Sequence, residues 1–495
     1  MRFLAIIPAL LLVRVGVAQK PITMTVLHTN DIHSHLEPTA IRGKTYGGVA
    51  RLATIIKQTR KREKNVILLN AGDCFQGTLY YNIYEGLAEA VLFSRMGFDA
   101  SCVGNHEFDK GIPSLVEFCK RINFPMLACN IDMDKEPELA KFVKPYTILT
   151  VDKQKVGIVG LITEDTGNIT MATQSLGFQK HLAPAQKAVD ELTTLGVNKI
   201  IVVSHIGYQE DQDLVKGLRN VDLVVGGHSH TPLGTPALDG WRASGGPYPT
   251  MVKDADGVDV PILQVWEWGK VFGELKIQFD AKGKLTKILT AKPIVVDESI
   301  PEDPEIASIV EAFKKPVDAM GSTVLGSSSE AYTNRTLVGY FVADSYVQAT
   351  KNVGVTVGFV NSGGVRSNIE AGKITFSMAN SVCPFRNTLV IAEMTGAEII
   401  QMLNDSKGSL IPSKDSRYKV AGGGVRDVVI AGEPLIETKA YKVVVNNFMA
   451  GGGDNMSTLK GVKKLDTGLN DIDAFVDYIK ANSPLSIGNE VRIGR

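Results

Sequence analysis

Leu27-His28-Thr29-Asn30-Asp31-Ile32-His33 begins as the end of an apolar β-strand and passes directly into a polar cluster. An Asp and a His in the arrangement Asp-x-His, placed after a strand, both reach the crevice at the carboxyl end of that strand. Open α/β sheets build their binding sites in this crevice, and carboxylate and imidazole are shared metal ligands. One such pattern is weak evidence for a metal site, so its weight depends on whether the chain repeats it.

The first half of the chain repeats this arrangement of a β-type run followed by polar residues. The runs cover residues 66–69, 100–103, 199–203 and 221–225. The polar clusters that follow them are Asn70-Ala71-Gly72-Asp73, Gly104-Asn105-His106-Glu107, Ser204-His205 and Gly226-Gly227-His228-Ser229-His230. Helical patterns at residues 87–96 and 183–195 and a further strand pattern at 156–161 lie between them. This alternation predicts an α/β sandwich.

The sequence after this region predicts the end of the first unit and a connection to a second. Residues 233–260 are rich in Gly, Pro and Asp and indicate a loop, and β-type alternation at 261–279 closes the unit before a turn at 280–283. A helical pattern at 305–320 follows Asp303-Pro304, which suits a capped helix start. We expect an inter-domain helix there. The remainder begins with a helical pattern at 337–349 and then mixes strands with Gly-rich loops.

The size and charge of the chain limit its organisation and its partners. A chain of 495 residues is too long for a single hydrophobic core, so two domains are expected. Lys plus Arg and Asp plus Glu each number 53, which gives a formal net charge of zero. No overall field therefore favours a nucleic acid polymer or an anionic membrane surface, although a local anion site remains compatible with this balance.

The two ends of the sequence carry expectations about export. Met1-Arg2, an apolar run at 3–13 that Arg14 interrupts, and the small residues up to Ala18 have the layout of a secretory signal at residues 1–18. The run is too short for a permanent bilayer anchor. Residues 486–495 are polar, so we expect no apolar tail of the kind that directs a lipid anchor. We expect a secreted protein, extracellular or periplasmic, without a membrane span.

The chain has five cysteines, and their spacing does not indicate a disulfide framework. The number is odd, and the residues are not densely paired. Free Cys is among the residue types that are most often buried, so buried free thiols are the expectation. The positions are Cys74, Cys102, Cys119, Cys129 and Cys383.

The polar residues at the strand ends form a candidate metal site. They are expected to meet at one edge of one sheet, and five of the eight histidines of the chain belong to them. Carboxylate, imidazole and amide oxygen suit borderline divalent cations such as Zn²⁺ and Mn²⁺. One carboxylate bridges two ions about 3.5–4 Å apart in two-metal phosphoryl-transfer sites. The candidates are Asp31, His33, Asp73, Asn105, His106, His205, His228 and His230.

A single histidine is more often a hydrogen-bonded structural residue than a metal ligand. Five histidines at separate strand ends do not easily share that explanation. For His28, inside the strand, and His181, before a helix, we keep the structural interpretation. For His35, the sequence leaves both interpretations open, a structural residue and a metal ligand.

The motifs are together specific enough to indicate a family. Asn30-Asp31-Ile32-His33-Ser34, Gly72-Asp73, Gly104-Asn105-His106-Glu107-Phe108-Asp109 and Gly227-His228-Ser229-His230 resemble the calcineurin-like metallophosphoesterases. Their order and spacing are similar to those of the 5′-nucleotidase family, which includes bacterial UDP-sugar hydrolases and animal ecto-5′-nucleotidases. The resemblance runs from about residue 22 to the C-terminus. It implies a four-layer α/β/β/α metallophosphoesterase sandwich at 22–300, a linker helix at 301–322 and a smaller α/β nucleotide-specificity domain at 323–495.

The resemblance also implies roles for the strand-end residues. Asp31, His33 and His230 would hold one divalent metal, Asn105, His205 and His228 would hold the other, and Asp73 would bridge them; Zn²⁺, Mn²⁺ and Co²⁺ suit such a site. Many relatives carry Gln or Asn where His230 stands. His106 would donate to the phosphate and stabilise the charge of the transition state, with Asp109 orienting its ring.

The second half carries a candidate nucleotide site. Asn361-Ser362-Gly363-Gly364-Val365-Arg366 lets backbone approach an anion while a guanidinium binds it. Phe385 and Phe448 could sandwich a base, and an Asp beside them could accept from ribose hydroxyls. Taken alone, these Phe residues fit a hydrophobic core and the Gly runs fit turns. The resemblance implies the substrate residues Arg335, Asn361, Arg366, Phe385, Phe448 and Asp454, with the match at Arg335 the loosest.

The sequence therefore predicts a secreted two-metal phosphohydrolase that converts nucleoside 5′-monophosphates to nucleoside and phosphate. Within the same chemistry, nucleoside di- and triphosphates, UDP-sugars and 2′,3′-cyclic nucleotides are alternative substrates that the motifs do not separate. A non-catalytic nucleotide-binding protein is a further alternative. That alternative requires a missing metal ligand, and none of the seven implied ligands is missing.

Overall fold

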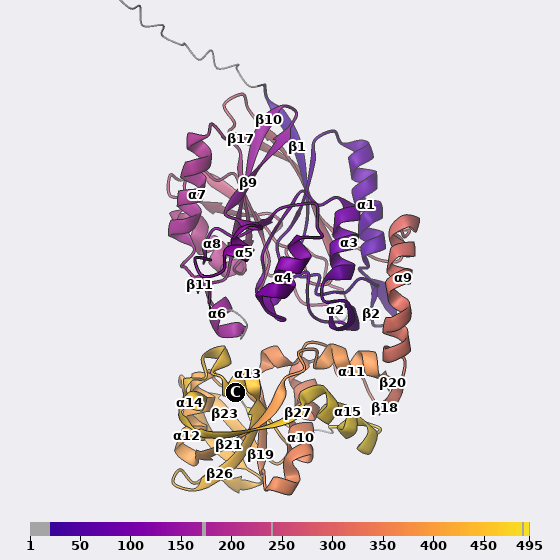
Figure 1. Ribbon diagram of the computed structural model, residues 1–495, viewed down its shortest axis with the longest axis vertical. Coiled ribbons are helices and arrows are strands. Elements are labelled where there is room, and N and C mark those ends of the chain that lie inside the picture. Colours follow the sequence, from indigo (N-terminus) through magenta and orange to yellow (C-terminus); the bar gives the residue numbers. More distant parts are fainter. Residues whose placement is uncertain (1–19, 171–174, 239–240, 488–489, 495) are drawn as a thin grey trace, which may run out of the picture.

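The computed structural model describes residues 20–170, 175–238, 241–487 and 490–494. The signal peptide predicted at residues 1–18 lies outside the described residues. The chain forms an upper unit from its first half and a lower unit from its second half, and helix α9 (Pro304–Gly321) runs down one side between them (Figure 1).

The first half contains a seven-stranded sheet in the order β17-β16-β1-β4-β5-β6-β8. Five of its strands, β1, β4, β5, β6 and β8, run parallel, and β16 and β17 add antiparallel strands at one side. The strands are β1 (Ile22–Thr29), β4 (Val66–Asn70), β5 (Ala100–Cys102), β6 (Met126–Leu127), β8 (Val143–Lys144), β16 (Val271–Phe279) and β17 (Leu285–Val295).

A six-stranded sheet in the order β14-β15-β13-β12-β10-β9 lies against the first one. Apolar side chains of both sheets form one fully buried cluster between them; Val26 and Leu69 come from the first sheet, and Ile158 and Val203 from the second. The strands are β9 (Tyr146–Val151), β10 (Gln154–Ile162), β12 (Ile200–His205), β13 (Leu223–Gly226), β14 (Thr250–Lys253) and β15 (Asp259–Leu263).

Helices cover the outer face of each sheet. Successive residues of a strand point to opposite faces, so Leu27 and Leu68 leave the inner cluster and pack on the helices outside the first sheet. These helices are α1 (Val49–Arg62), α3 (Leu87–Met96) and α4 (Ile112–Cys119), whereas α7 (Leu182–Thr194) and α8 (Tyr208–Gly217) cover the second sheet. The predicted four-layer α/β/β/α sandwich is confirmed.

One region of the first half differs from its prediction. The predicted loop at 233–260 contains strand β14 and the start of β15, and the predicted strand run at 261–279 is interrupted between Leu263 and Val271. β14 is an edge strand paired on one side only, which tolerates exposed side chains such as Met251 and the turn-forming residues around it. The interruption leaves the sheet and lies beside the polar residues at the strand ends.

Helix α9 begins as the sequence predicts. The Asp303 side chain accepts from the backbone N–H of Ile306 at 3.1 Å, and Pro304 occupies the first helical position, where a missing N–H costs nothing. Val310 and Val317 are buried against the first half, in the same core as α1 and α3. The Lys314 ammonium pairs with the Glu37 carboxylate. The helix therefore belongs physically to the surface of the first half while it leads into the second.

The second half is built on a five-stranded sheet in the order β22-β19-β26-β21-β27, with a separate four-stranded sheet in the order β25-β24-β23-β28. One face of the larger sheet packs on α10 and α15, and the other packs on α12. The elements are α10 (Arg335–Thr350), β19 (Val357–Val360), β21 (Thr388–Thr395), α12 (Gly396–Asp405), β22 (Ile411–Pro412), β23 (Arg417–Ala421), β24 (Gly424–Ile430), β25 (Glu433–Pro434), β26 (Ala440–Asn446), β27 (Lys463–Asn470), α15 (Asp471–Ala481) and β28 (Ile493–Gly494).

Short elements complete the fold. They include three two-stranded pairs, β2 with β3, β7 with β11 and β18 with β20. Their bounds and those of the remaining short helices are β2 (Thr39–Ile41), β3 (Lys44–Tyr46), α2 (Leu79–Tyr84), β7 (Ile131–Asp132), α5 (Pro137–Ala140), α6 (Thr166–Ile169), β11 (Gly177–Phe178), β18 (Val324–Ser328), β20 (Gly372–Thr375), α11 (Phe376–Val382), α13 (Asn447–Ala450) and α14 (Ser457–Gly461).

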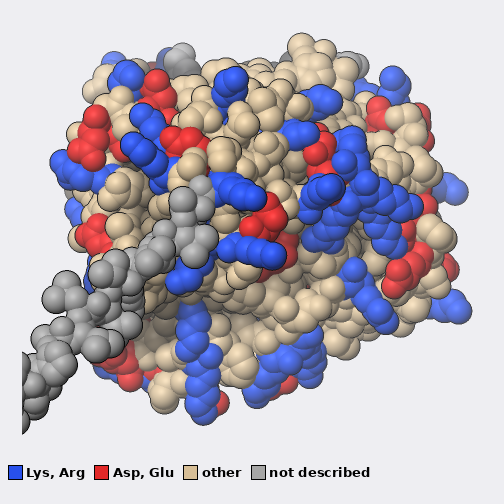
Figure 2. Space-filling model, turned by 90° about the horizontal axis from the view of Figure 1, so that it is seen from above, with Lys and Arg blue, Asp and Glu red and all other residues tan. Residues whose placement is uncertain are grey.

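The surface and the cysteines follow the composition. Figure 2 shows Lys and Arg side chains scattered among Asp and Glu on the face seen from above. Within the described ranges, no helix combines the length and the apolar character that crossing a bilayer requires.

All five cysteines are free thiols, and each is buried except Cys129, which is half-buried. Burial raises the pKa of the Cys102 and Cys383 thiols, so the expectation of buried free thiols is confirmed.

Candidate metal centre and nucleotide pocket

The polar residues at the strand ends meet where the two sheets of the first half adjoin. Asp31 and His33 follow β1, Asp73 follows β4, and Asn105 and His106 follow β5, all in the seven-stranded sheet. His205 ends β12, and His228 and His230 follow β13, both in the six-stranded sheet. The expectation of one edge of one sheet is therefore wrong. Strand periodicity identifies the carboxyl end of each strand but does not reveal which sheet the strand joins.

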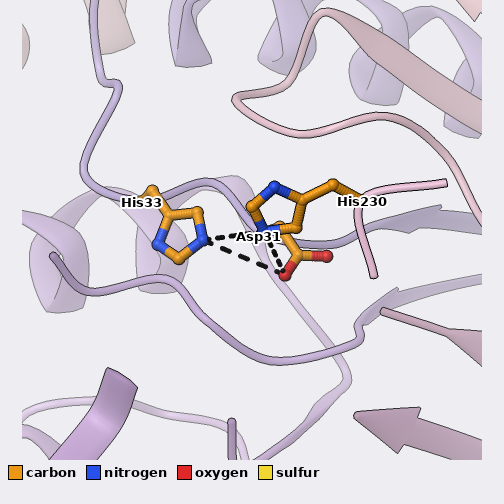
Figure 3. A group of neighbouring side chains, drawn as sticks. All are labelled: Asp31, His33 and His230. Carbon is orange, nitrogen blue, oxygen red and sulfur yellow. Dashed lines mark hydrogen bonds and ion pairs between the residues drawn. The ribbon is translucent and has the colours of Figure 1, made fainter. Parts of the chain in front are cut away.

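The first ligand group consists of Asp31, His33 and His230 (Figure 3). One possible ligand atom from each residue lies within 4.8 Å of the others. Nε2 of His230 lies 3.2 Å from Oδ1 of Asp31 and 3.1 Å from Nε2 of His33. Three donors that converge on one point from two loops, one after β1 and one after β13, fit a single divalent cation.

The second ligand group consists of Asp73, His205 and His228. Nε2 of His205 lies 3.0 Å from Oδ2 of Asp73, and the same oxygen lies 3.7 Å from Nε2 of His33 in the first group. Oδ1 of Asn105 is buried and has no hydrogen-bond partner among the residues that the structure describes. A buried amide oxygen without a partner is costly, and a cation would satisfy it. The donor set therefore fits two cations with Asp73 between them.

The backbone at this site is held in an uncommon conformation. Asp31, His33, Asp73, His228 and His230 have φ between 49° and 72°, which non-Gly residues rarely adopt. Neighbouring loops hold one another, because the N–H of Asp31 donates to the Gly72 carbonyl and the N–H of His33 donates to that of Asp73, both at 3.0 Å. Gly72 itself has φ of 82°, and a Cβ there would lie 2.6 Å from Nδ1 of His205. The strain is maintained by packing and serves to aim the side chains inward.

Three of the four candidate histidine ligands, His33, His205 and His230, use Nδ1 to anchor the ring. Nδ1 of His33 lies 3.0 Å from the Phe75 carbonyl, and Nδ1 of His205 lies 2.6 Å from the Ala71 carbonyl. His230 differs, because its Nδ1 is hydrogen-bonded to the Glu267 carboxylate. An Nδ1–H that donates in this way leaves Nε2 to bind a metal.

The charges at the site call for a cation. Burial alone would lower the pKa of His205. The carboxylates of Asp73 and Asp31 outweigh this effect and raise the pKa to about 10. The pKa of Asp73 behaves in the opposite sense: burial raises it, and the rings of His205, His106 and His33 bring it well below its ordinary value. The buried carboxylates therefore stabilise positive charge beside them, and bound divalent ions would supply such charge.

His106 and Asp109 form a pair beside the metal groups. Nδ1 of His106 lies 2.8 Å from Oδ2 of Asp109, and the backbone N–H of His106 donates to Oδ1 of Asp73 at 2.9 Å. His106 belongs to neither ligand group, and it lines both cavities that adjoin the metal groups. The pair is therefore placed to act on a group bound at the metals.

Two carboxylates that the sequence did not assign support the site. Glu107 is fully buried and accepts from the backbone N–H groups of Asp73, Cys74 and Gly104 at 2.9, 2.8 and 2.6 Å. It fixes the loop that presents Asp73, and its position inside the motif Gly104-Asn105-His106-Glu107 was a signal that could have found it. Glu267 lies in the interruption between β15 and β16 and contacts His230, Lys270 and Arg335. No motif in the sequence marks it.

A cavity of about 460 Å³ adjoins the metal groups and is lined by both halves of the chain. Phe385 and Phe448 line it and are partly exposed, so neither is a fully buried core residue. The Phe385 ring stacks on the His106 ring with centroids 5.7 Å apart. From the first half come Asn105, His106, Asp109 and His228, and from the second come Asn361, Gly363, Gly364, Arg366, Phe385, Phe448 and Asp454.

The polar residues of the second half form a connected set in this cavity. Nδ2 of Asn361 donates to Oδ2 of Asp454 at 2.7 Å, and Oδ1 of Asn361 accepts from Nδ2 of Asn446 at 2.9 Å. Burial raises the pKa of Asp454. Nη2 of Arg366 reaches 3.3 Å from Nε2 of His33, across the boundary between the halves.

Arg335 lies elsewhere. It lines a second cavity of about 470 Å³, together with His106, His230, Arg242 and Arg366, and not the cavity that holds the two Phe rings. Its Nη2 donates to the Glu267 carboxylate at 3.3 and 3.4 Å. Arg335 therefore shares a cavity with Arg366 and with metal-site residues such as His230, but not with the other four substrate candidates.

The histidines outside the set have structural contacts. Nε2 of His28 lies 2.8 Å from the Tyr248 hydroxyl, and burial lowers the pKa of His28 to about 3. Nε2 of His181 accepts from the backbone N–H of Glu164 at 3.2 Å. The structural interpretation of both is supported. His35, which was open, stacks on Trp268 with ring centroids 4.0 Å apart, and it belongs to neither ligand group.

Comparison with known proteins agrees with this geometry. Residues 24–232 match the family model for calcineurin-like phosphoesterases, and residues 318–461 match that for the C-terminal domain of 5′-nucleotidases. The chain is 33% identical to a 5′-nucleotidase of Bos taurus, over 98% of this chain and 94% of that protein. It is 34% identical to a snake venom 5′-nucleotidase of Naja atra, over 92% of this chain and 96% of that protein.

A solved structure shares the whole architecture. A 5′-nucleotidase precursor from Thermus thermophilus superposes with a TM-score of 0.91 at 38% identity, covering 96% of this chain and 99% of that one. The match includes both halves and the metallophosphoesterase sandwich. The chain therefore belongs to the 5′-nucleotidase family and is a metal-dependent hydrolase of nucleotide phosphoesters.

Proposed function

We propose that the protein is a two-metal 5′-nucleotidase that converts nucleoside 5′-monophosphates to nucleoside and phosphate. The single observation that carries this proposal is the cavity of about 460 Å³, which the metal-site residues Asn105 and His228 share with the two Phe rings of the second half. A nucleoside held between the rings has its 5′ side directed toward the metal groups. A phosphate at that position is the reacting group.

In this proposal the metal ligands have the roles that the family resemblance implies. Asp31, His33 and His230 would hold one divalent ion, Asn105, His205 and His228 would hold the other, and Asp73 would be shared between the two groups. The donor set suits Zn²⁺, Mn²⁺ or Co²⁺. Two such ions supply an activated water at neutral pH and neutralise charge on the attacking and leaving oxygens. The residues themselves fix where the phosphate binds and exclude other orientations.

His106 is the proposed catalytic residue of the protein itself. Asp109 accepts from Nδ1 of His106 at 2.8 Å, which holds the ring in place. The other ring nitrogen then donates to a phosphate oxygen. The charge on that oxygen grows in the transition state, so this hydrogen bond becomes stronger there.

The second half selects the nucleoside in this proposal. Phe385 and Phe448 stack on the base, Asp454 accepts from ribose hydroxyls, and Asn361 orients Asp454 through the 2.7 Å hydrogen bond. Arg366, which lines both cavities together with His106, binds the phosphate. Residues 22–300, 301–322 and 323–495 are then the catalytic domain, the linker helix and the specificity domain, and α9 is the region about which they move.

A second candidate has a specific observation in its favour. The second cavity, of about 470 Å³, is lined by Arg242, Arg335 and Arg366. It offers room and positive charge for a group attached beyond the reacting phosphate. UDP-sugars and nucleoside di- or triphosphates have such a group, whereas 2′,3′-cyclic nucleotides do not.

Phosphate release from a substrate panel tests these candidates. The panel consists of AMP, ATP, UDP-glucose and the isomers of cyclic AMP, assayed with the same metal supplement. A 5′-nucleotidase has its highest kcat/KM on AMP. A higher kcat/KM on ATP or UDP-glucose rejects the monophosphate assignment and identifies the cavity of about 470 Å³ as part of the substrate site.

Export is also part of the proposal. The layout of residues 1–18 supports it, and the relatives include 5′-nucleotidases of snake venoms. N-terminal sequencing of the protein from the culture medium or the periplasm tests it. A mature chain that begins near Gln19 is expected, and a chain that keeps Met1 and stays in the cell contradicts it.

A further inference from the structure

Glu267 is a buried carboxylate with cationic or proton-donating partners on three sides. Its side chain is 6% exposed, and it accepts from Nδ1 of His230, from Nζ of Lys270 at 3.1 Å and from Nη2 of Arg335 at 3.3 Å. His230 and Lys270 belong to the first half, whereas Arg335 is the first residue of α10 in the second half. The carboxylate therefore joins a candidate metal ligand to the opposite half of the molecule.

We infer that Glu267 is a positioning residue that orients His230 toward its metal and that the second half holds it in place through Arg335. The inference rests on the metal role proposed for His230. Glu267 itself lies behind the ligand and touches neither phosphate nor nucleoside in this assignment.

The inference follows first from how the three histidine anchors differ. His33 and His205 are anchored by the backbone carbonyls of Phe75 and Ala71, which are fixed by the fold. Only for His230, among these three, is the anchor a side chain. A side-chain anchor works when its own position is fixed, and a carboxylate anchor makes the imidazole a stronger donor to the metal.

Lys270 fixes the anchor from within the first half. Its side chain is 1% exposed, and its ammonium lies 3.4 Å from the centre of the Trp266 ring and 4.2 Å from that of Trp268. An ammonium packed between two indole rings has little freedom to move, and a buried cation needs a nearby carboxylate. Lys270 and Glu267 therefore hold each other whether or not the second half is docked.

Arg335 adds a support that depends on docking. Its side chain is 38% exposed, and its guanidinium lies over the Trp268 ring at 5.9 Å while it donates to Glu267. The backbone N–H of Trp268 donates to the carbonyl of Asp31, another ligand of the same metal group, at 2.8 Å. Movement of the second half away from the first removes Arg335 from this cluster but leaves Lys270 in place.

The test measures bound metal per chain after dialysis of the whole protein against a chelator, together with the melting temperature. Glu267→Gln should lower affinity for one of two metal equivalents by about 10- to 100-fold, the usual cost of losing such a partner. Arg335→Met should have a smaller effect on retention of the same equivalent. Because Glu267→Gln leaves Lys270 without its carboxylate, the double variant Glu267→Gln/Lys270→Met provides a fold without an unpaired buried charge and should show the same metal loss.

A matched control separates positioning from general stability. Asp344 forms a buried ion pair with Arg492 at 2.6 Å within the second half, away from the metal groups. Asp344→Asn should lower the melting temperature and keep both metal equivalents. Retention of both equivalents by Glu267→Gln, with wild-type release rates, would overturn the inference.

A double-mutant comparison asks whether Glu267 acts through His230. His230→Ala weakens the same metal equivalent, and adding Glu267→Gln to it should cause no further loss. A further loss of similar size in the double variant means that Glu267 acts independently of His230 and rejects the inference. A wild-type protein that binds no metal would instead reject the proposed function, so the two failures are distinct.

Discussion

Nη2 of Arg366 lies 3.3 Å from Nε2 of His33, although 333 residues separate them in the sequence. His33 belongs to the first metal group, and Arg366 follows the glycine pair of the second half. A candidate metal ligand of the first half and a candidate substrate residue of the second half therefore lie within hydrogen-bonding distance. In the proposed function, turnover requires both halves.

Asp73→Ala should be the most damaging change of a single ligand. Oδ2 of Asp73 lies 3.0 Å from His205 and 3.7 Å from His33, so one carboxylate serves both metal groups. We expect both metal equivalents to be weakened in Asp73→Ala, whereas His33→Ala should weaken mainly one. Elemental analysis after gel filtration measures this, and a loss confined to one equivalent in Asp73→Ala would count against the bridging role.

His106→Ala should lower kcat while metal content stays near that of the wild type. A group that stabilises charge on the transferring phosphoryl contributes more in the transition state than in the ground state. Asp109→Asn should have a smaller effect in the same direction, because it weakens only the 2.8 Å contact that holds the ring. If metal occupancy falls together with kcat in His106→Ala, His106 is a ligand and the assigned role is wrong.

Phe448→Ala should weaken AMP hydrolysis selectively. If its ring stacks on the base, the loss in kcat/KM is about 1–3 kcal/mol. Hydrolysis of p-nitrophenyl phosphate, whose leaving group cannot fill the gap between two rings, should change much less.

The matched control is Phe359→Ala, since Phe359 is only 1% exposed in the core of the same half. Truncating a core Phe costs about 3–5 kcal/mol of stability. Phe359→Ala should therefore lower the melting temperature and impair both substrates together. The same behaviour in Phe448→Ala would identify that ring as part of the core and remove it from the nucleotide site.

The strand-end residues of the first half could be predicted because their signal is local. Asp31, Asp73 and His205 each follow an apolar run, and the carboxyl end of a strand is visible in the sequence. The two-sheet sandwich followed from the family resemblance, but the sheet to which each strand belongs was not predictable, since periodicity does not tell which strands pair. Glu267 was missed because it lies between two strands and owes its position to Lys270 and Arg335, contacts that exist only in the folded protein.

The second half was less predictable from its residues. Phe385 and Phe448 fit a core as well as a clamp in the sequence. In the structure both are half-buried beside a cavity, and Phe448 also packs on the core of the second half. Arg335 matched the family pattern loosely, and its contact with Glu267 could not be anticipated because the partner itself carried no motif. Candidate site residues on loops could therefore be evaluated only with the tertiary structure, whereas those at strand ends could be identified from the sequence.

Glu89→Gln should remove a pH dependence of stability. Burial raises the pKa of Glu89 to about 7, whereas a Glu in the unfolded chain titrates near about 4.3. Between these values the folded state binds more protons, so the free energy of unfolding falls as the pH rises and the loss is complete above about pH 8. Denaturant unfolding at pH 5 and pH 8.5 measures this. The free energy of unfolding of Glu89→Gln, relative to that of the wild type, should be about 1–4 kcal/mol higher at pH 8.5 than at pH 5. A difference that does not change with pH would contradict the assignment.

The central claim is that catalysis requires two divalent ions bound by the strand-end residues, and titration of the metal-free enzyme tests it most directly. The protein is exhaustively chelated, metal loss is confirmed by elemental analysis, and AMP hydrolysis is followed as Mn²⁺, Co²⁺ or Zn²⁺ is returned. The account predicts no turnover in the stripped protein and recovery that is complete only when two equivalents are bound. Full activity on AMP in protein shown to contain no metal would contradict it.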